Sequence, residues 1–219
     1  HLSFSDSIFM PLVVPRKVTF LAKSEYFTSP GLKGFVKKLT FQALGQVPVD
    51  RSGGRRSEAA LLTGLRLLSE GACIGIYPEG TRSPDGKLYK GRTGIARMAL
   101  ESGAPVIPVA MLNTAEIQPT GQVVPKVRQV EMRFGEPMNF TGDPSDIKLL
   151  RSITDEIMEK IKELSGQEYV DMYASEAKIA IAKARLVANK AESAAKRQAR
   201  KVAKKTRKTS KTRKPKSEA

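Results

Sequence analysis

The chain has 219 residues, of which 38 are Lys or Arg and 22 are Asp or Glu, giving a formal net charge of +16. Hydrophobic residues make up 40% of the chain and a single Cys is present, which excludes a wholly disordered protein and a disulfide-stabilised secreted scaffold. Its apolar runs are far shorter than the roughly 20 residues of a membrane-spanning helix. The composition predicts one domain with a hydrophobic core and an appendage, in a reducing compartment.

The positive charge is concentrated in the last part of the chain. Residues 178–219 hold 16 Lys and Arg against two acids, Glu192 and Glu218, a net of +14. We expect an Ala-, Lys- and Arg-rich helical extension over residues 166–203 and a disordered basic tail over 204–219. Such a tail attracts anionic membrane surfaces and nucleic acid, although the lack of aromatic residues argues against base recognition. A solubilising extension without a partner is the alternative.

Residues 1–165 alternate short β-rich runs with helical patterns. This rhythm predicts a single α/β domain with a mostly parallel or mixed sheet flanked by helices. We expect, in chain order, a strand at 17–22, a helix at 32–44, a strand at 46–49, a helix capped by Ser57 and ended by Gly71, a buried strand at 73–77, a helix at 94–102 closed by Gly103, a buried strand at 106–111, a strand at 127–134 and a helix at 146–164. The last helix should turn five apolar residues inward: Ile147, Leu150, Ile153, Ile157 and Ile161.

A histidine and an aspartate, His1 and Asp6, are separated by four residues at the start of the sequence. On a regular helix their side chains would diverge by about 140°. They can therefore meet only if His1 lies in a turn and Asp6 near the start of a helix. An aspartate in that position binds one imidazole nitrogen and leaves the other free as a base. Taken alone, this spacing can also arise by chance.

The segment Tyr77-Pro78-Glu79-Gly80-Thr81-Arg82-Ser83 directly follows the predicted strand at 73–77. Ligands of α/β sheets gather at such strand ends. Gly80 lets the backbone approach a ligand, Thr81 supplies a hydroxyl, and Arg82 offers a planar fork for phosphate. The alternative is a tight turn in which Glu79 and Arg82 merely pair.

Two further positions have simpler interpretations. Arg51 follows the strand at 46–49 and is a second candidate for binding phosphate, whereas Pro108 interrupts the run at 106–111 and indicates a sheet edge or a bulge.

One His and one Cys without clustered acids give no metal-ligand set, and Cys73 lies in an apolar strand. We therefore predict no metal, no cofactor and no cysteine nucleophile.

Taken in order, four segments resemble the motifs of the glycerophospholipid acyltransferase family: His1 with Asp6, Val49-Asp50-Arg51, Pro78-Glu79-Gly80-Thr81-Arg82-Ser83 and Val106-Ile107-Pro108-Val109. The resemblance covers about residues 1–164. It implies transfer of a fatty acyl group from acyl-CoA or acyl-carrier protein to the sn-2 hydroxyl of 1-acyl-sn-glycerol-3-phosphate, in phospholipid biosynthesis. It also implies catalytic roles for His1 and Asp6, and substrate binding by Arg51, Glu79, Gly80, Thr81 and Arg82.

Membrane association follows from the same resemblance. Family members carry an apolar region before the histidine, so we expect the domain to be truncated at its N-terminus in this sequence, and the enzyme to lie on the cytoplasmic face of the cell membrane, peripheral or anchored. Its partners would be a lysophospholipid, an acyl thioester and the anionic membrane surface. Within the family, glycerol-3-phosphate or another lysophospholipid is the alternative acceptor. Outside it, the alternative is a polyanion-binding protein acting through the basic tail.

Overall fold

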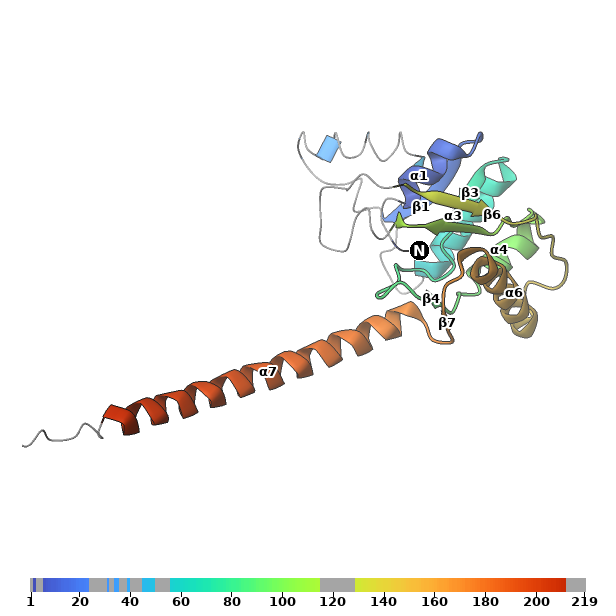
Figure 1. Cartoon of the computed structure of the whole chain (residues 1–219). Helices are drawn as coiled ribbons and strands as arrows, with labels where there is room; N and C mark the ends of the chain where they lie inside the picture. The colour runs from blue at the N-terminus through green and yellow to red at the C-terminus, as the bar shows by residue number, and fades with distance from the viewer. Residues whose placement is uncertain are drawn as a thin grey trace, which may run out of the picture. The chain divides into compact units, whose positions relative to one another are not determined.

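The computed structural model describes residues 2, 6–23, 31, 34–35, 39, 45–49, 56–114 and 129–211, so most of the predicted helix at 32–44 lies outside them. The chain divides into two compact units, His1–Ala174 and Ser175–Ala219. The elements of the first unit are, in order, α1 (Asp6–Val13), β1 (Val18–Lys23), β2 (Gln46–Val49), α3 (Arg56–Ser69), β3 (Cys73–Gly75), β4 (Leu88–Tyr89), α4 (Gly94–Ser102), β5 (Val109–Leu112), β6 (Glu131–Phe134), α6 (Ile147–Ser165) and β7 (Tyr169–Val170) (Figure 1).

The strands form one three-stranded sheet and two strand pairs. In the parallel sheet, in the order β2-β1-β3, Phe20 of β1 lies opposite Gln46 on one side and Gly75 on the other. The β5–β6 pair is antiparallel and the β4–β7 pair is parallel. Helices α3, α4 and α6 surround these strands in Figure 1. This mixed α/β arrangement with a small parallel sheet confirms the predicted fold class.

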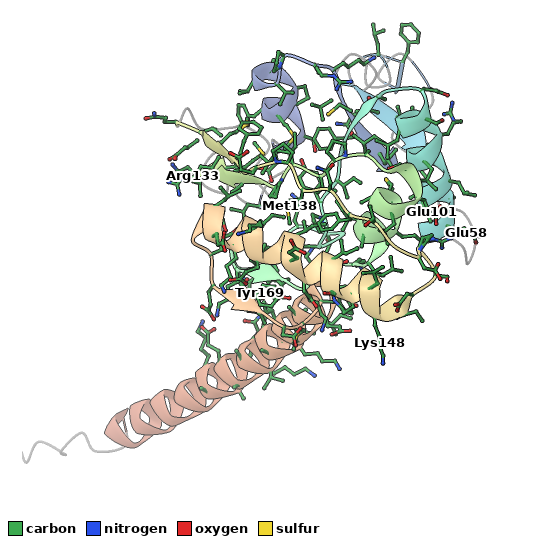
Figure 2. The ribbon with its side chains drawn as sticks, turned by 90° about the vertical axis from the view of Figure 1, so that its right-hand side faces the viewer. Glu58, Glu101, Arg133, Met138, Lys148 and Tyr169 are labelled. Atoms are coloured by element: carbon green, nitrogen blue, oxygen red, sulfur yellow. The ribbon has the colours of Figure 1, made fainter. Side chains whose placement is uncertain are left out.

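A hydrophobic core joins α4 to α6. Ala96, Leu150, Ile153 and Ile157 are buried there, and partly buried apolar side chains pack against them, among them Met138, which is labelled beside α6 in Figure 2. The prediction for α6 is wrong for Ile147, which is 78% exposed. This residue begins the helix directly after its cap, Asp146, and the core first covers the helix one turn later.

Two strands predicted as long and buried are shorter and partly exposed. The first, β3, ends at Gly75 and its three residues are half-buried. The second, β5, begins at Val109, while Val106 forms an isolated bridge with Met138. Pro108 explains the late start of β5 because it has no N–H to donate to a ladder, although its carbonyl accepts from the Gly135 amide at 2.9 Å.

Two helices end at the predicted glycines, but one helix does not begin at its predicted N-cap. Gly71 and Gly103 adopt φ of +78° and +65° just beyond α3 and α4, as expected of glycines that end helices. Ser57, by contrast, lies inside the first turn of α3, which begins at Arg56. Of the predicted strand at 127–134, residues 131–134 form β6 and residues 127–128 lie outside the described residues.

The C-terminal part of the chain departs from the predicted boundaries. Residues 169–170 form β7 and belong to the first unit, which extends to Ala174. Helix α7 (Ala174–Lys211) continues past residue 203, where the sequence predicts disorder; residues 204–211 contain neither Gly nor Pro, the two residues that most disfavour helix. Among the described residues, no helix combines the length and apolarity that crossing a membrane requires.

Candidate active site

Asp6 is the first residue of α1 and is 1% exposed. Its Oδ2 accepts a hydrogen bond of 3.0 Å from the backbone amide of Leu2. The backbone amide of Leu2, the residue after His1, therefore lies against this carboxylate, while His1 itself lies outside the described residues. Asp6 thus occupies the start of a helix, which is the position that pairing with His1 requires.

A hydrogen bond joins the start of α1 to the segment that follows β3. Ser7 Oγ and the Tyr77 hydroxyl lie 2.8 Å apart, and the Tyr77 ring stacks on Phe20 of β1 with centroids 5.5 Å apart. Burial raises the pKa of the Tyr77 phenol well above its ordinary value of 10.0; the Ser7 bond opposes this rise and the charge of Asp6 adds to it. Tyr77 is therefore a neutral hydroxyl close to Asp6, and two predicted motifs meet at one place.

Glu79 anchors the turn that carries the second motif. It is 2% exposed, and its Oε1 accepts from the backbone amide of Tyr89 in β4 at 2.9 Å. The turn closes where the Gly80 amide donates to the Tyr77 carbonyl at 3.0 Å. Gly80 has a φ of +70°, which other residues adopt at a cost.

The end of the turn faces solvent. Thr81 is half-buried and Arg82 is exposed. Glu79 accepts a hydrogen bond from the Tyr89 amide of β4, so its carboxylate has a partner other than Arg82. The Arg82 guanidinium is accessible to a phosphate from solvent, whereas Arg51 lies outside the described residues.

Asp6 and Glu79 line the same cavity, which has a volume of about 500 Å³. Other walls of this cavity are mainly apolar, with Met10 from α1, Ile76 after β3 and Val106 before β5. The sequence did not reveal these walls because their apolar residues have the same pattern as core residues. Within the described residues, no group of three His, Cys, Asp or Glu side chains is placed to hold a metal ion.

Sequence reasoning also missed Arg92, which lies beside the Gly80 turn. Its backbone amide donates to the Pro78 carbonyl at 2.8 Å. A Cβ atom added to Gly80 would lie 3.2 Å from both Cδ and Nε of Arg92. Arg92 stands in the short connection between β4 and α4, where no local motif marks it.

The known proteins that the chain resembles are acyltransferases. A family described as Acyltransferase matches residues 1–112. The 1-acyl-sn-glycerol-3-phosphate acyltransferase of Bacillus subtilis is 31% identical over 172 residues, which cover 76% of this chain and 79% of that protein. The chloroplastic enzyme BAT2 of Brassica napus, of the same name, is 33% identical over 121 residues, which cover 55% of this chain and 33% of that protein.

A solved structure extends the likeness to the fold. The crystal structure of PlsC from Thermotoga maritima, a 1-acyl-sn-glycerophosphate acyltransferase, aligns with a TM-score of 0.54 and 28% sequence identity. The alignment covers 75% of this chain and 63% of that one. The chain therefore spans about a third of the Brassica relative and most of the Bacillus relative.

Proposed function

Since the chain belongs to the acyltransferase family, we propose that it transfers a fatty acyl group from an acyl thioester to the sn-2 hydroxyl of 1-acyl-sn-glycerol-3-phosphate, giving phosphatidic acid. The acceptor is inferred from the names of the Bacillus and Brassica relatives. The observation that carries the proposal is the shared cavity of Asp6 and Glu79, in which two motifs distant in sequence face one apolar space. Acyl-CoA and acyl-carrier protein are both candidate donors.

In the proposed reaction His1 acts as a general base. Its imidazole takes the proton of the sn-2 hydroxyl while that oxygen attacks the thioester carbonyl. The tetrahedral intermediate then collapses, the carbon–sulfur bond breaks, and the imidazolium returns the proton to the leaving thiolate. Asp6, oriented by the Leu2 amide, fixes the imidazole tautomer and stabilises the imidazolium. The products are an ester and a free thiol, and no acyl-enzyme forms.

The turn after β3 supplies the proposed acceptor site. Arg82, exposed at its end, binds the phosphate through its planar fork, with Arg51 as a second candidate, while Thr81 adds a hydroxyl. Glu79 holds the turn against β4 through the Tyr89 amide, and Gly80 permits its left-handed bend. The apolar walls around Met10 suit the hydrocarbon chain of a substrate.

The basic C-terminal part supports a location at the cytoplasmic face of the membrane. A lysophospholipid acceptor resides in the bilayer, and the +14 charge of residues 178–219 would attract anionic lipids by about 1 kcal/mol for each basic residue close to the surface. Deleting residues 178–219 should abolish salt-sensitive binding to vesicles containing phosphatidylserine, with phosphatidylcholine vesicles as the control. Unchanged binding after the deletion would refute this role. If the full chain binds RNA but not the vesicles, the polyanion-binding alternative explains the tail.

The reaction is tested with a panel of substrates in detergent or liposomes. The purified protein is given long-chain acyl-CoA or acyl-carrier protein as donor, and 1-acyl-sn-glycerol-3-phosphate, glycerol-3-phosphate or lysophosphatidylcholine as acceptor. We expect phosphatidic acid as the main product with at least one donor. Preferential acylation of another acceptor would replace the proposed acceptor, and no transfer to any of them would refute the activity.

A further inference from the structure

Helix α1 is followed by exposed apolar surface. Residues 8–15, which include most of this helix, are all apolar. A helix that is apolar on every side is normally buried on every side. At the end of α1, however, Leu12 and Val13 are 73% and 58% exposed. Figures 1 and 2 both show α1 at the edge of the first unit, across the strands from α6.

Another face of the same helix closes the cavity of the proposed site. Asp6, Met10 and Val14 follow one another at intervals of four residues, and all three line the cavity. Leu12 and Val13 lie between Met10 and Val14 in the sequence and are exposed instead. A single turn of chain therefore lies between the apolar cavity and the exposed apolar end of α1.

Two cations directly follow this exposed end. Helix α1 ends at Val13, and Arg16 and Lys17 come soon after it, both exposed. Nη2 of Arg16 donates to the Gly71 carbonyl at 3.0 Å, and both residues line the cavity. Residues 7–24 contain no acidic residue, so this part of the chain is purely cationic.

This order of side chains matches the layers of an anionic lipid surface. Apolar side chains at such a surface enter the boundary between headgroups and acyl chains, while arginine and lysine keep their charged ends among the headgroups. A second copy of the chain fits less well. A symmetric contact through this surface would bring Arg16 and Lys17 of both copies together, and like charges at an interface oppose association.

We propose that Leu12, Val13, Arg16 and Lys17 form a docking surface for an anionic lipid bilayer, the α1 docking surface, which sets the cavity beside the hydrocarbon layer. The inference rests on the proposed function, in which a lipid substrate leaves the bilayer and enters the cavity. Contact at this surface lets a fatty acyl chain pass from one apolar environment to another with little exposure to water. It gives the domain that holds the site a membrane contact of its own, in addition to the attraction of the basic tail.

Insertion can be measured directly because the sequence contains no tryptophan. Leu12→Trp places a single tryptophan in the α1 docking surface, and the matched control Leu62→Trp places one on α3, where Leu62 is 61% exposed. Both full-length variants are mixed with vesicles of phosphatidylcholine and phosphatidylserine. The emission of Leu12→Trp should shift to shorter wavelength and be quenched by lipids brominated on their acyl chains, whereas the emission of Leu62→Trp should stay as it is in buffer. No change for Leu12→Trp, or equal changes in the two variants, would overturn the inference.

Vesicle sedimentation measures how much the apolar side chains contribute. In 1 M NaCl the attraction between the basic tail and the lipids is screened to a range of about 3 Å. Under this condition, replacing both Leu12 and Val13 by Ser should weaken partitioning of the full chain into the vesicles about 10- to 100-fold. Leu62→Ser should leave the partitioning unchanged. Equal partitioning of the double variant and wild type would overturn the inference.

Activity separates a failure of the inference from a failure of the proposed function. The double serine variant should match wild type on 1-acyl-sn-glycerol-3-phosphate in detergent and lose most of its activity on the same acceptor in vesicles. Equal activity in vesicles would overturn the inference and leave the proposed function intact. If wild type acylates no acceptor, the proposed function fails, and the tryptophan measurement alone decides the inference. A wild-type dimer that the two serines dissociate would assign the surface to a second copy and overturn the inference.

Discussion

A methyl group added at Gly75, which lines the same cavity as Asp6 and Glu79, should disturb the site through the neighbouring aromatic rings. Gly75 lies opposite Phe20 in the β1–β3 pair, and a Cβ atom built on it would come within 2.3 Å of Phe20 Cε1 and 2.5 Å of Cζ. Phe20 is 3% exposed and its ring is stacked on Tyr77, so it has little room to withdraw. Gly75→Ala should therefore displace the Phe20 ring and, with it, the Tyr77 ring.

The cost follows from overpacking a closed core. An added methyl group that forces buried side chains off their rotamers costs about 1 to 3 kcal/mol. For a chain of this size, that free energy lowers the melting temperature by roughly 2 to 12 °C. Activity should fall as well, since Tyr77 links the turn of Glu79 to Ser7 beside Asp6.

Thermal and urea unfolding, combined with the acylation assay, measure both effects. The matched control is Gly94→Ala at the start of α4, where the added Cβ meets no heavy atom within 4 Å among the described residues and should be neutral or stabilise slightly. Phe20→Leu should partly rescue Gly75→Ala, with a favourable coupling of at least about 0.5 kcal/mol in a double-mutant cycle. Gly75→Ala with wild-type stability, or additive effects in the cycle, would refute the reasoning.

Three further predictions concern the site itself. Asp6→Asn should keep the Leu2 hydrogen bond and the fold but lower kcat by roughly 10³- to 10⁴-fold; near-normal turnover would contradict its role. Glu79→Ala should cost about 1 to 3 kcal/mol in urea unfolding because the buried Tyr89 amide loses its acceptor, whereas Glu79→Gln keeps one; equal costs would contradict this account. Burial raises the pKa of Tyr89 from 10.0 to about 12, with a contribution from Asp85. The contribution of this shift to the free energy of unfolding is therefore complete below pH 10 and is lost as the pH rises through 12. The fall in unfolding free energy between pH 9 and 12 should therefore be smaller in Tyr89→Phe than in wild type. An identical fall in the two proteins would contradict this role of Tyr89.

Local patterns predicted the parts of the molecule that local forces build. The glycines after α3 and α4 end those helices, and the alternation of strands and helices gives the α/β class. The motif residues Asp6 and Glu79 were recognised because their spacing and their place at the ends of elements are visible in the sequence. Their meeting in one cavity depends on packing between α1 and the segment after β3, which no local pattern encodes.

The features that the sequence did not predict depend on contacts between distant segments or on position at the end of an element. Strands β4 and β7 have two residues each, too few to show an alternating pattern, and they pair across a separation of 81 residues. The sequence therefore assigned residues 166–173 to the basic extension, and Arg92 remained unnoticed. Ile147 has the right spacing for a buried face but lies at the helix end, where spacing does not report on burial. The roles of His1 and Arg51, outside the described residues, stay predictions.

The central claim is that an Asp6-oriented histidine removes the proton of the acceptor hydroxyl. Its most direct test is phosphatidic acid formation from long-chain acyl-CoA or acyl-carrier protein and 1-acyl-sn-glycerol-3-phosphate, measured side by side for wild type, His1→Ala and the control Arg97→Gln, which changes an exposed arginine paired with Glu101 on α4. The account predicts product with wild type and the control, and a loss of at least about 10³-fold in kcat with His1→Ala. Product formation by His1→Ala at a rate near that of wild type would contradict it.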